Sequence, residues 1–177
     1  MKIYREWAMP NRNTFTIKPI YELLQRYIKN TDVIIDPFAN TSKIANITND
    51  MNPSFDTNYN LDALEFLTIM DNNSADIILF DPPYSFTQAK ECYDGYGSEL
   101  LSHDKIPTKM DYWASCKKEV ARILKPSGIC ISFGWHSNGV GIINGCEIIE
   151  ILLVAHGGSQ NDTIVTVDRK IQQTLDF

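Results

Sequence analysis

The stretch Ala75–Tyr84, ADIILFDPPY, decides the fold of this chain. The apolar run Ile77–Phe80 is short and is bounded by residues that break regular structure, which is typical of a strand covered on both faces. Two consecutive prolines cannot continue the hydrogen-bond ladder of a sheet, and they stiffen the backbone beyond Asp81. We therefore expect a rigid, non-helical corner at the carboxyl end of a buried strand, which is where open α/β sheets bind ligands.

This corner carries a carboxylate, an unpaired carbonyl and an aromatic ring within four residues. The Asp81 side chain and the Pro82 carbonyl can both accept hydrogen bonds from one amino group, and the ring of Tyr84 can stack on a flat heterocycle. The motif resembles the D/N/S-PP-Y/F motif of the amino-directed DNA methyltransferases, which make N6-methyladenine or N4-methylcytosine. The resemblance implies a catalytic site made of Asp81, Pro82, Pro83 and Tyr84.

A second match to this family follows the first predicted strand, Val33–Asp36. In the family, a D-P-F-x-G-x-G turn at this place wraps S-adenosylmethionine, and Asp36, Pro37 and Phe38 match its first three positions. A turn between a strand end and a helix start suits a carboxylate or another polar group of a ligand. The resemblance therefore implies that these three residues bind the cofactor.

Two residues depart from the glycines of that turn, Asn40 and Ser42. Asparagine tolerates a positive φ better than most residues that have a side chain, so Asn40 is a partial substitute and we count it among the cofactor-binding residues. Serine does not tolerate a positive φ in this way, so we interpret Ser42 as a cap of a helix expected to begin near Thr41.

The remaining cofactor residues follow a second predicted strand, 44–49. An acid just past this strand, Asp50, is the expected acceptor for the hydroxyl groups of a ribose, and Met51 can pack on an adenine ring. In the family an Asp-Ala pair contacts the adenine, which implies the same roles for Asp62 and Ala63. The alternative for Asp62 is a helix N-cap, and the two roles are compatible.

The order of these acids carries more weight than any one of them. Asp36, Asp50, Asp62 and Asp81 lie at successive predicted strand ends about 12–20 residues apart, as βαβ units require. The resemblance then implies an α/β fold, the Rossmann-like class I methyltransferase fold, with a mostly parallel sheet and a C-terminal antiparallel hairpin. Residues 1–16 are expected to be irregular. The other expected elements are a helix at 17–28 capped by Thr16, a helix at 112–124, a strand at 129–133 and hairpin strands at 146–155 and 163–168.

Length and composition are those of one globular domain. We interpret residues 1–177 as a single methyltransferase domain without a separate target-recognition domain, and 85–111 as a lid or substrate loop. No apolar run is long enough for a membrane span and the start lacks the apolar core of a signal peptide, so a cytoplasmic protein is expected. The four cysteines show no metal-binding spacing, so we expect free thiols and no metal.

The sequence thus favours an S-adenosylmethionine-dependent methyltransferase of the small phage or mobile-element type that acts on adenine N6 in DNA. RNA adenine and DNA cytosine N4 are alternative targets, and a catalytically decayed fold that serves as a binding module is a third interpretation. The net charge of −6 argues against tight autonomous binding to nucleic acid. A homodimer or a partner protein is therefore a possible source of target recognition.

Overall fold

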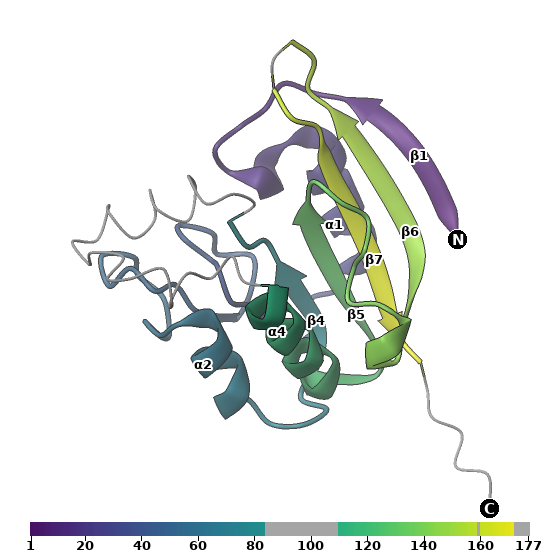
Figure 1. Cartoon of the computed structure of the whole chain (residues 1–177). Coiled ribbons are helices and arrows are strands. Elements are labelled where there is room, and N and C mark those ends of the chain that lie inside the picture. The colour runs from purple at the N-terminus through teal and green to yellow at the C-terminus, as the bar shows by residue number, and fades with distance from the viewer. Residues whose placement is uncertain (84–109, 159, 172–177) are drawn as a thin grey trace, which may run out of the picture.

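The computed structural model describes residues 1–83, 110–158 and 160–171, which form a seven-stranded sheet in the order β1-β6-β7-β5-β4-β2-β3 (Figure 1). Strand β7 is antiparallel to both of its neighbours, and all other pairs are parallel. The expected mostly parallel sheet with a C-terminal antiparallel hairpin is confirmed. The strands are β1 (Lys2–Trp7), β2 (Ile34–Asp36), β3 (Ile47–Thr48), β4 (Ala75–Phe80), β5 (Leu124–Gly134), β6 (Cys146–Ala155) and β7 (Thr163–Lys170).

Helices cover the two faces of this sheet and make a three-layer arrangement. Helix α1 (Lys18–Tyr27) packs on one face, whereas α2 (Ala63–Ile69) and α4 (Met110–Ile123) pack together on the other (Figure 1). Two short 3-10 helices, η1 (Thr14–Thr16) and η2 (Ile142–Asn144), complete the described elements.

Strand β4 lies between β2 and β5 and has apolar side chains on both faces. Ile77 and Leu79 belong to the core under α1, and Ile78 and Phe80 belong to the core under α2 and α4. The prediction of a strand covered on both faces is therefore confirmed. The strand ends at Phe80, so the two prolines begin outside the sheet and Asp81 lies at its carboxyl edge.

The N-terminal segment differs from the sequence-based expectation, because residues 2–7 form a strand rather than irregular chain. Strand β1 pairs with β6 over six residues, from Lys2 opposite Glu150 to Trp7 opposite Ala155. It is mostly exposed, so its residues show no alternation of buried and polar positions. Only pairing with a strand far along the chain defines it, and such pairing leaves no local signal.

The helix expected near Thr41 is also absent, and a run of turns and bends links β2 to β3. The side chain of Asn46 accepts from the Ile34 amide at 2.8 Å and donates to the Asp32 carbonyl at 2.9 Å, which ties the end of this connection back to the start of β2. An asparagine that bonds the backbone in this way favours a turn over a helix. The proposed helix-capping role of Ser42 is therefore wrong.

Two helix boundaries are shifted as well. Thr16 is not the N-cap of α1, because Ile17 takes that position and the Thr16 hydroxyl donates to the Asn13 carbonyl at 2.8 Å within η1. Helix α4 begins two residues before the expected start. Strand β5 begins directly after it, with an irregularity at Ser127, whose φ is 64°.

Among the described residues, no helix is both long and apolar enough to cross a bilayer. No group of three or more potential ligands in that part of the chain is placed to hold a metal ion. Cys116, Cys130 and Cys146 are buried free thiols, and Cys92 lies outside the described residues.

A buried carboxylate joins β1, α1 and β6. Glu150 lies on β6 with 7% of its side chain exposed, and it receives hydrogen bonds from Arg26 and, at 2.7 Å, from the Tyr27 hydroxyl. The Lys2 ammonium lies 3.7 Å away. Burial raises the pKa of Glu150, but the hydrogen bonds from Tyr27 and Tyr4 and the charge of Arg26 outweigh it, so this pKa lies below its ordinary value.

We predict that Glu150→Gln lowers the free energy of unfolding by about 1.5–3 kcal/mol at neutral pH, because hydrogen bonds to a charged group are lost. The matched change Glu147→Gln, which breaks an exposed pair with Arg169, should cost less than about 1 kcal/mol. A lowered pKa stabilises the fold above the ordinary pKa and loses that effect as pH falls, so the Glu150 difference should shrink in acid. Urea denaturation at neutral and acidic pH measures both, and equal costs at the two sites would contradict this assignment.

Candidate functional site

A cavity of about 890 Å³ opens at the carboxyl ends of β2, β3 and β4. Its wall contains most of the residues that the sequence assigned to catalysis or to the cofactor, and η1 with the segment before it closes another side. Asp36 lies buried beside the cavity, and Tyr84 lies outside the described residues, as do 85–109 of the expected loop. The assigned residues that line the cavity are Pro37, Phe38, Asn40, Asp50, Met51, Asp62, Ala63, Asp81, Pro82 and Pro83.

The turn after β2 has the backbone shape that the sequence suggested. Asn40 has a φ of 49°, the left-handed conformation that a glycine would adopt at no cost. Ser42 is not among the described residues with positive φ, and its amide donates to the Ala39 carbonyl at 2.7 Å. A glycine is therefore needed at neither position for the turn to form.

Asp50 is fixed by the same turn. Its Oδ2 accepts from the Asn40 amide and its Oδ1 accepts from the Asn52 amide, both at 2.9 Å. Burial raises the pKa of Asp50, although these two bonds oppose the change. A carboxylate oxygen can accept more than one hydrogen bond, so Asp50 keeps capacity for hydroxyl groups of a ligand in the cavity.

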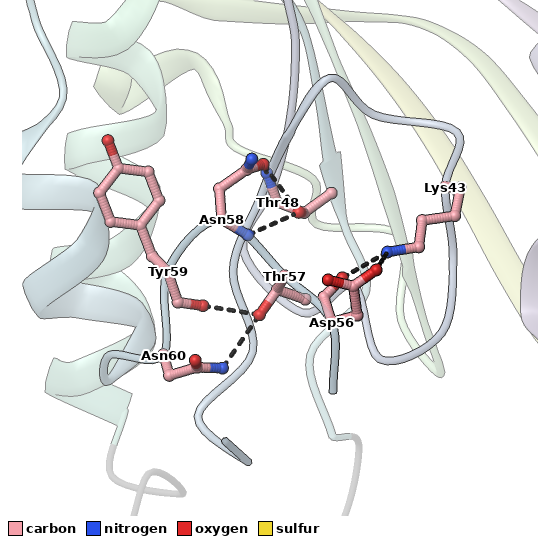
Figure 2. Close-up of polar contacts among 7 residues, drawn as sticks. All are labelled: Lys43, Thr48, Asp56, Thr57, Asn58, Tyr59 and Asn60. Atoms are coloured by element: carbon pink, nitrogen blue, oxygen red, sulfur yellow. Dashed lines mark hydrogen bonds and ion pairs between the residues drawn. The ribbon is translucent and has the colours of Figure 1, made fainter. Parts of the chain in front are cut away.

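A segment without regular structure covers the outer edge of β3 and leads to Asp62. The Tyr59 amide donates to the Thr48 carbonyl at 3.1 Å. The Asn58 side chain accepts from the Thr48 amide at 2.8 Å (Figure 2). Lys43 and Asp56 make an exposed ion pair at 2.8 Å that joins this segment to the turn after β2 (Figure 2). One backbone bridge at Tyr59 and several side-chain bonds thus take the place of a further strand.

Asp62 is the N-cap of α2, so the alternative role considered for it is confirmed. Its Oδ1 accepts from the Leu64 amide at 2.9 Å, and the Tyr112 hydroxyl donates to its Oδ2 at 2.9 Å. Ala63 is the first helical residue, and its amide has no acceptor within the helix. This amide and the second lone pair of Asp62 Oδ2 are the groups that this corner offers to a ligand.

Two cavity residues on α4, Tyr112 and Trp113, were not assigned to the site from the sequence. Trp113 makes a tilted contact with Phe38 at 6.1 Å and an edge contact with Phe80 at 6.2 Å between ring centroids, which builds an aromatic wall. Burial raises the pKa of Tyr112, and nearby Cys116 and Asp62 raise it further, so Tyr112 remains a neutral donor. The sequence predicted for both residues only a place within the helix expected at 112–124.

The cavity concentrates acids. Asp50, Asp62 and Asp81 line it, and Asp36 is fully buried beside it, with its Oδ2 bonded to no described residue. Burial, together with the charges of Asp81 and Asp50, raises the pKa of Asp36 to about 8, although the hydrogen bond from the Phe38 amide opposes the change. An orphaned acid under an acid-lined cavity suits a ligand that carries positive charge. Among the described lining residues, Arg12 is a cation without an ion pair.

Solved structures share this fold, although no family model and no curated protein matches the sequence. TrmN from Thermus thermophilus aligns with a TM-score of 0.59 at 13% identity, over 90% of this chain and 50% of its own. A SAM-dependent methyltransferase from Methanosarcina mazei aligns with 0.56 at 11% identity, over 86% and 99%. The 1,6-didemethyltoxoflavin-N1-methyltransferase of Burkholderia thailandensis, solved with S-adenosylhomocysteine, aligns with 0.56 at 11% identity, over 88% and 78%.

At such identities the likeness concerns the fold alone. The sheet order, the single reversed strand and the cavity at the strand ends define the Rossmann-like class I methyltransferase fold, as expected from the sequence.

We predict that Asp36→Asn flattens the dependence of stability on pH. Between the ordinary carboxyl pKa of 3.8 and about 8, the folded protein binds one more proton than the unfolded chain, so stability falls as pH rises, by up to about 1.4 kcal/mol per unit. Asparagine cannot titrate, so the free energy of unfolding of the variant should rise relative to that of the wild type from pH 5 to pH 8.

The matched control is Asp56→Asn, because Asp56 is exposed and its pKa is lowered by Lys43. Its difference from the wild type should not change over that pH range. Thermal unfolding at several pH values measures both variants, and a constant difference for Asp36→Asn would show that the acid titrates normally.

Proposed function

We propose that the protein is an S-adenosylmethionine-dependent methyltransferase that methylates N6 of adenine in DNA. One observation carries the proposal: the Asp81-Pro82 corner opens into the same cavity as the residues assigned to the cofactor. A cavity of about 890 Å³ has room for a methyl donor and an acceptor side by side, which direct transfer requires. The DNA target rests on the resemblance of the DPPY motif.

The residues present fit this cofactor. Asp50 would accept from the ribose hydroxyls, and the Ala63 amide with the Asp62 carboxylate would bind the adenine edge. The acids favour a positively charged cofactor, and Arg12, which also lines the cavity, would hold its carboxylate. When bound, S-adenosylmethionine supplies an activated methyl group on a sulfonium sulfur. Related folds in the structures above carry a SAM-dependent description or S-adenosylhomocysteine, which supports this assignment.

The corner would act on the amine of the target base. The Asp81 carboxylate and the Pro82 carbonyl accept its two N–H bonds, which draws the nitrogen lone pair out of conjugation with the ring and aims it at the methyl group. Tyr84 is proposed to stack on the base. No covalent bond to the protein is required, so the rate comes mainly from positioning and from these two acceptors. A base in a duplex must first leave the stack.

Binding of the cofactor is the first test. Calorimetry with S-adenosylmethionine should give binding by the wild type, and Asp50→Asn should weaken it about tenfold, because a charged acceptor for the ribose is lost. Asp56→Asn is the matched control on the neighbouring exposed segment and should bind as the wild type does. Absence of binding by the wild type would favour a decayed fold that serves as a binding module.

Methyl transfer is the second test. Tritiated S-adenosylmethionine with genomic DNA, followed by nucleoside analysis, should yield N6-methyladenine. Asp81→Ala should lower the rate about 10²-fold or more while cofactor binding persists, because the amine loses its acceptor. Unchanged transfer by Asp81→Ala would refute the mechanism. Label in N4-methylcytosine, or in RNA supplied in parallel, would instead assign the alternative substrate.

A further inference from the structure

The sheet of the described residues ends at β1, whose outer edge has no neighbour there. This edge is six residues long, contains no proline, and pairs with β6 without a bulge. Ile3 and Trp7 on it are 63% and 64% exposed. Proteins keep an edge strand single with prolines, bulges, a covering loop or charged side chains. In the described chain β1 has charged side chains, at Lys2, Arg5 and Glu6, but no proline, bulge or covering loop.

The backbone of β1 shows which residues face outward. The Ala8 amide donates to the Ala155 carbonyl of β6 at 3.1 Å. Peptide groups alternate between the two sides of a strand, so the even-numbered residues 2–6 also direct their N–H and C=O groups toward β6. The N–H and C=O groups of Ile3, Arg5 and Trp7 therefore point away from the sheet and are available for another strand.

We propose that β1 pairs antiparallel with β1 of a second copy of this chain, about a two-fold axis at Tyr4. An axis perpendicular to the sheet keeps the faces of both copies aligned. Ile3 then lies opposite Arg5 of the second copy, in positions that exchange both backbone hydrogen bonds. Lys2 lies opposite Glu6 of the second copy, and Tyr4 lies opposite Tyr4.

Charge selects this register over its neighbours. Lys2 and Glu6 occupy non-hydrogen-bonded positions, where the Cα atoms approach to about 4.5 Å and the side chains are closest, so the two-fold axis makes two attractive pairs. An axis at Arg5 would place two arginines opposite each other, and an axis at Ile3 would leave Glu6 beyond the paired residues. Glu6 has no ion pair with any described residue. The Lys2 ammonium lies 3.7 Å from Glu150, but its side chain is 60% exposed, so it can turn toward Glu6 of the second copy.

The pairing is independent of the proposed methyl transfer. The two copies of each strand run in opposite directions, so the carboxyl ends of the strands, and the cavities there, lie at opposite edges of the joined sheet. Lys2 and Glu6 do not line the cavity, so changes at either residue should leave cofactor binding intact. An experiment can therefore refute the dimer without refuting methyl transfer, and the reverse.

Sedimentation velocity over a concentration series tests the proposal. The wild type should form dimers, and Glu6→Lys, which places two lysines opposite each other, should raise the dimer dissociation constant about tenfold or more. Lys2→Glu should do the same with two glutamates. An equimolar mixture of these two variants should form the heterodimer, because each glutamate of one variant then faces a lysine of the other.

Two further variants keep the result unambiguous. Arg5→Pro removes an outward amide without removing a bond to β6 and should abolish the dimer, whereas Glu22→Lys repeats the charge change on α1 and should leave it intact. Unchanged thermal unfolding shows that each variant is folded. A monomeric wild type at all concentrations, or a dimer that Glu6→Lys does not weaken, would overturn the proposal.

Discussion

Parallel pairing of β2 with β4 is the constraint on which the site depends. The pairs Ile34–Ile77 and Ile35–Ile78 fix the two strands side by side, so Asp36 and the Asp81 corner project at the same edge of the sheet. The prolines after Asp81 prevent the chain from extending the strand past that edge. The closeness of the two acids therefore follows from the path of the backbone.

This closeness has an energetic cost. Burial and the neighbouring charges of Asp81 and Asp50 raise the pKa of Asp36 to about 8, so the folded chain resists ionisation of a group that the unfolded chain ionises readily. The two apolar cores that pack on both faces of β4 stabilise the sheet and offset the cost of keeping Asp36 buried. Acids with a perturbed pKa gather at functional sites, and a ligand of opposite charge bound in the cavity would reduce this energetic cost.

The sequence predicts those parts of the fold whose signals are local. β4, the hairpin β6–β7 and α1 have strong apolar patterns, and Asp36, Asp50 and Asp81 lie at or just after strand ends as their spacing predicts. Asp62 was also expected at a strand end, but it is the N-cap of α2. β1 and the absence of a helix near Thr41 could not be predicted. The first depends on pairing with a strand 148 positions further along the chain, and the second on the Asn46 side chain bonding the backbone of a strand. Tyr112 joins the site for a similar reason: its hydroxyl reaches Asp62 across 50 residues of chain.

The same acids limit how a nucleic acid can approach. Among the described residues that line the cavity the cations are Arg12 and Lys43, and Lys43 already pairs with Asp56. A phosphate near this mouth would meet repulsion from Asp50 and Asp81 that water and salt screen only in part. A neutral base meets no such penalty. In the proposed reaction the base therefore enters alone while its backbone stays at a distance, and the residues that hold that backbone must lie away from the cofactor wall.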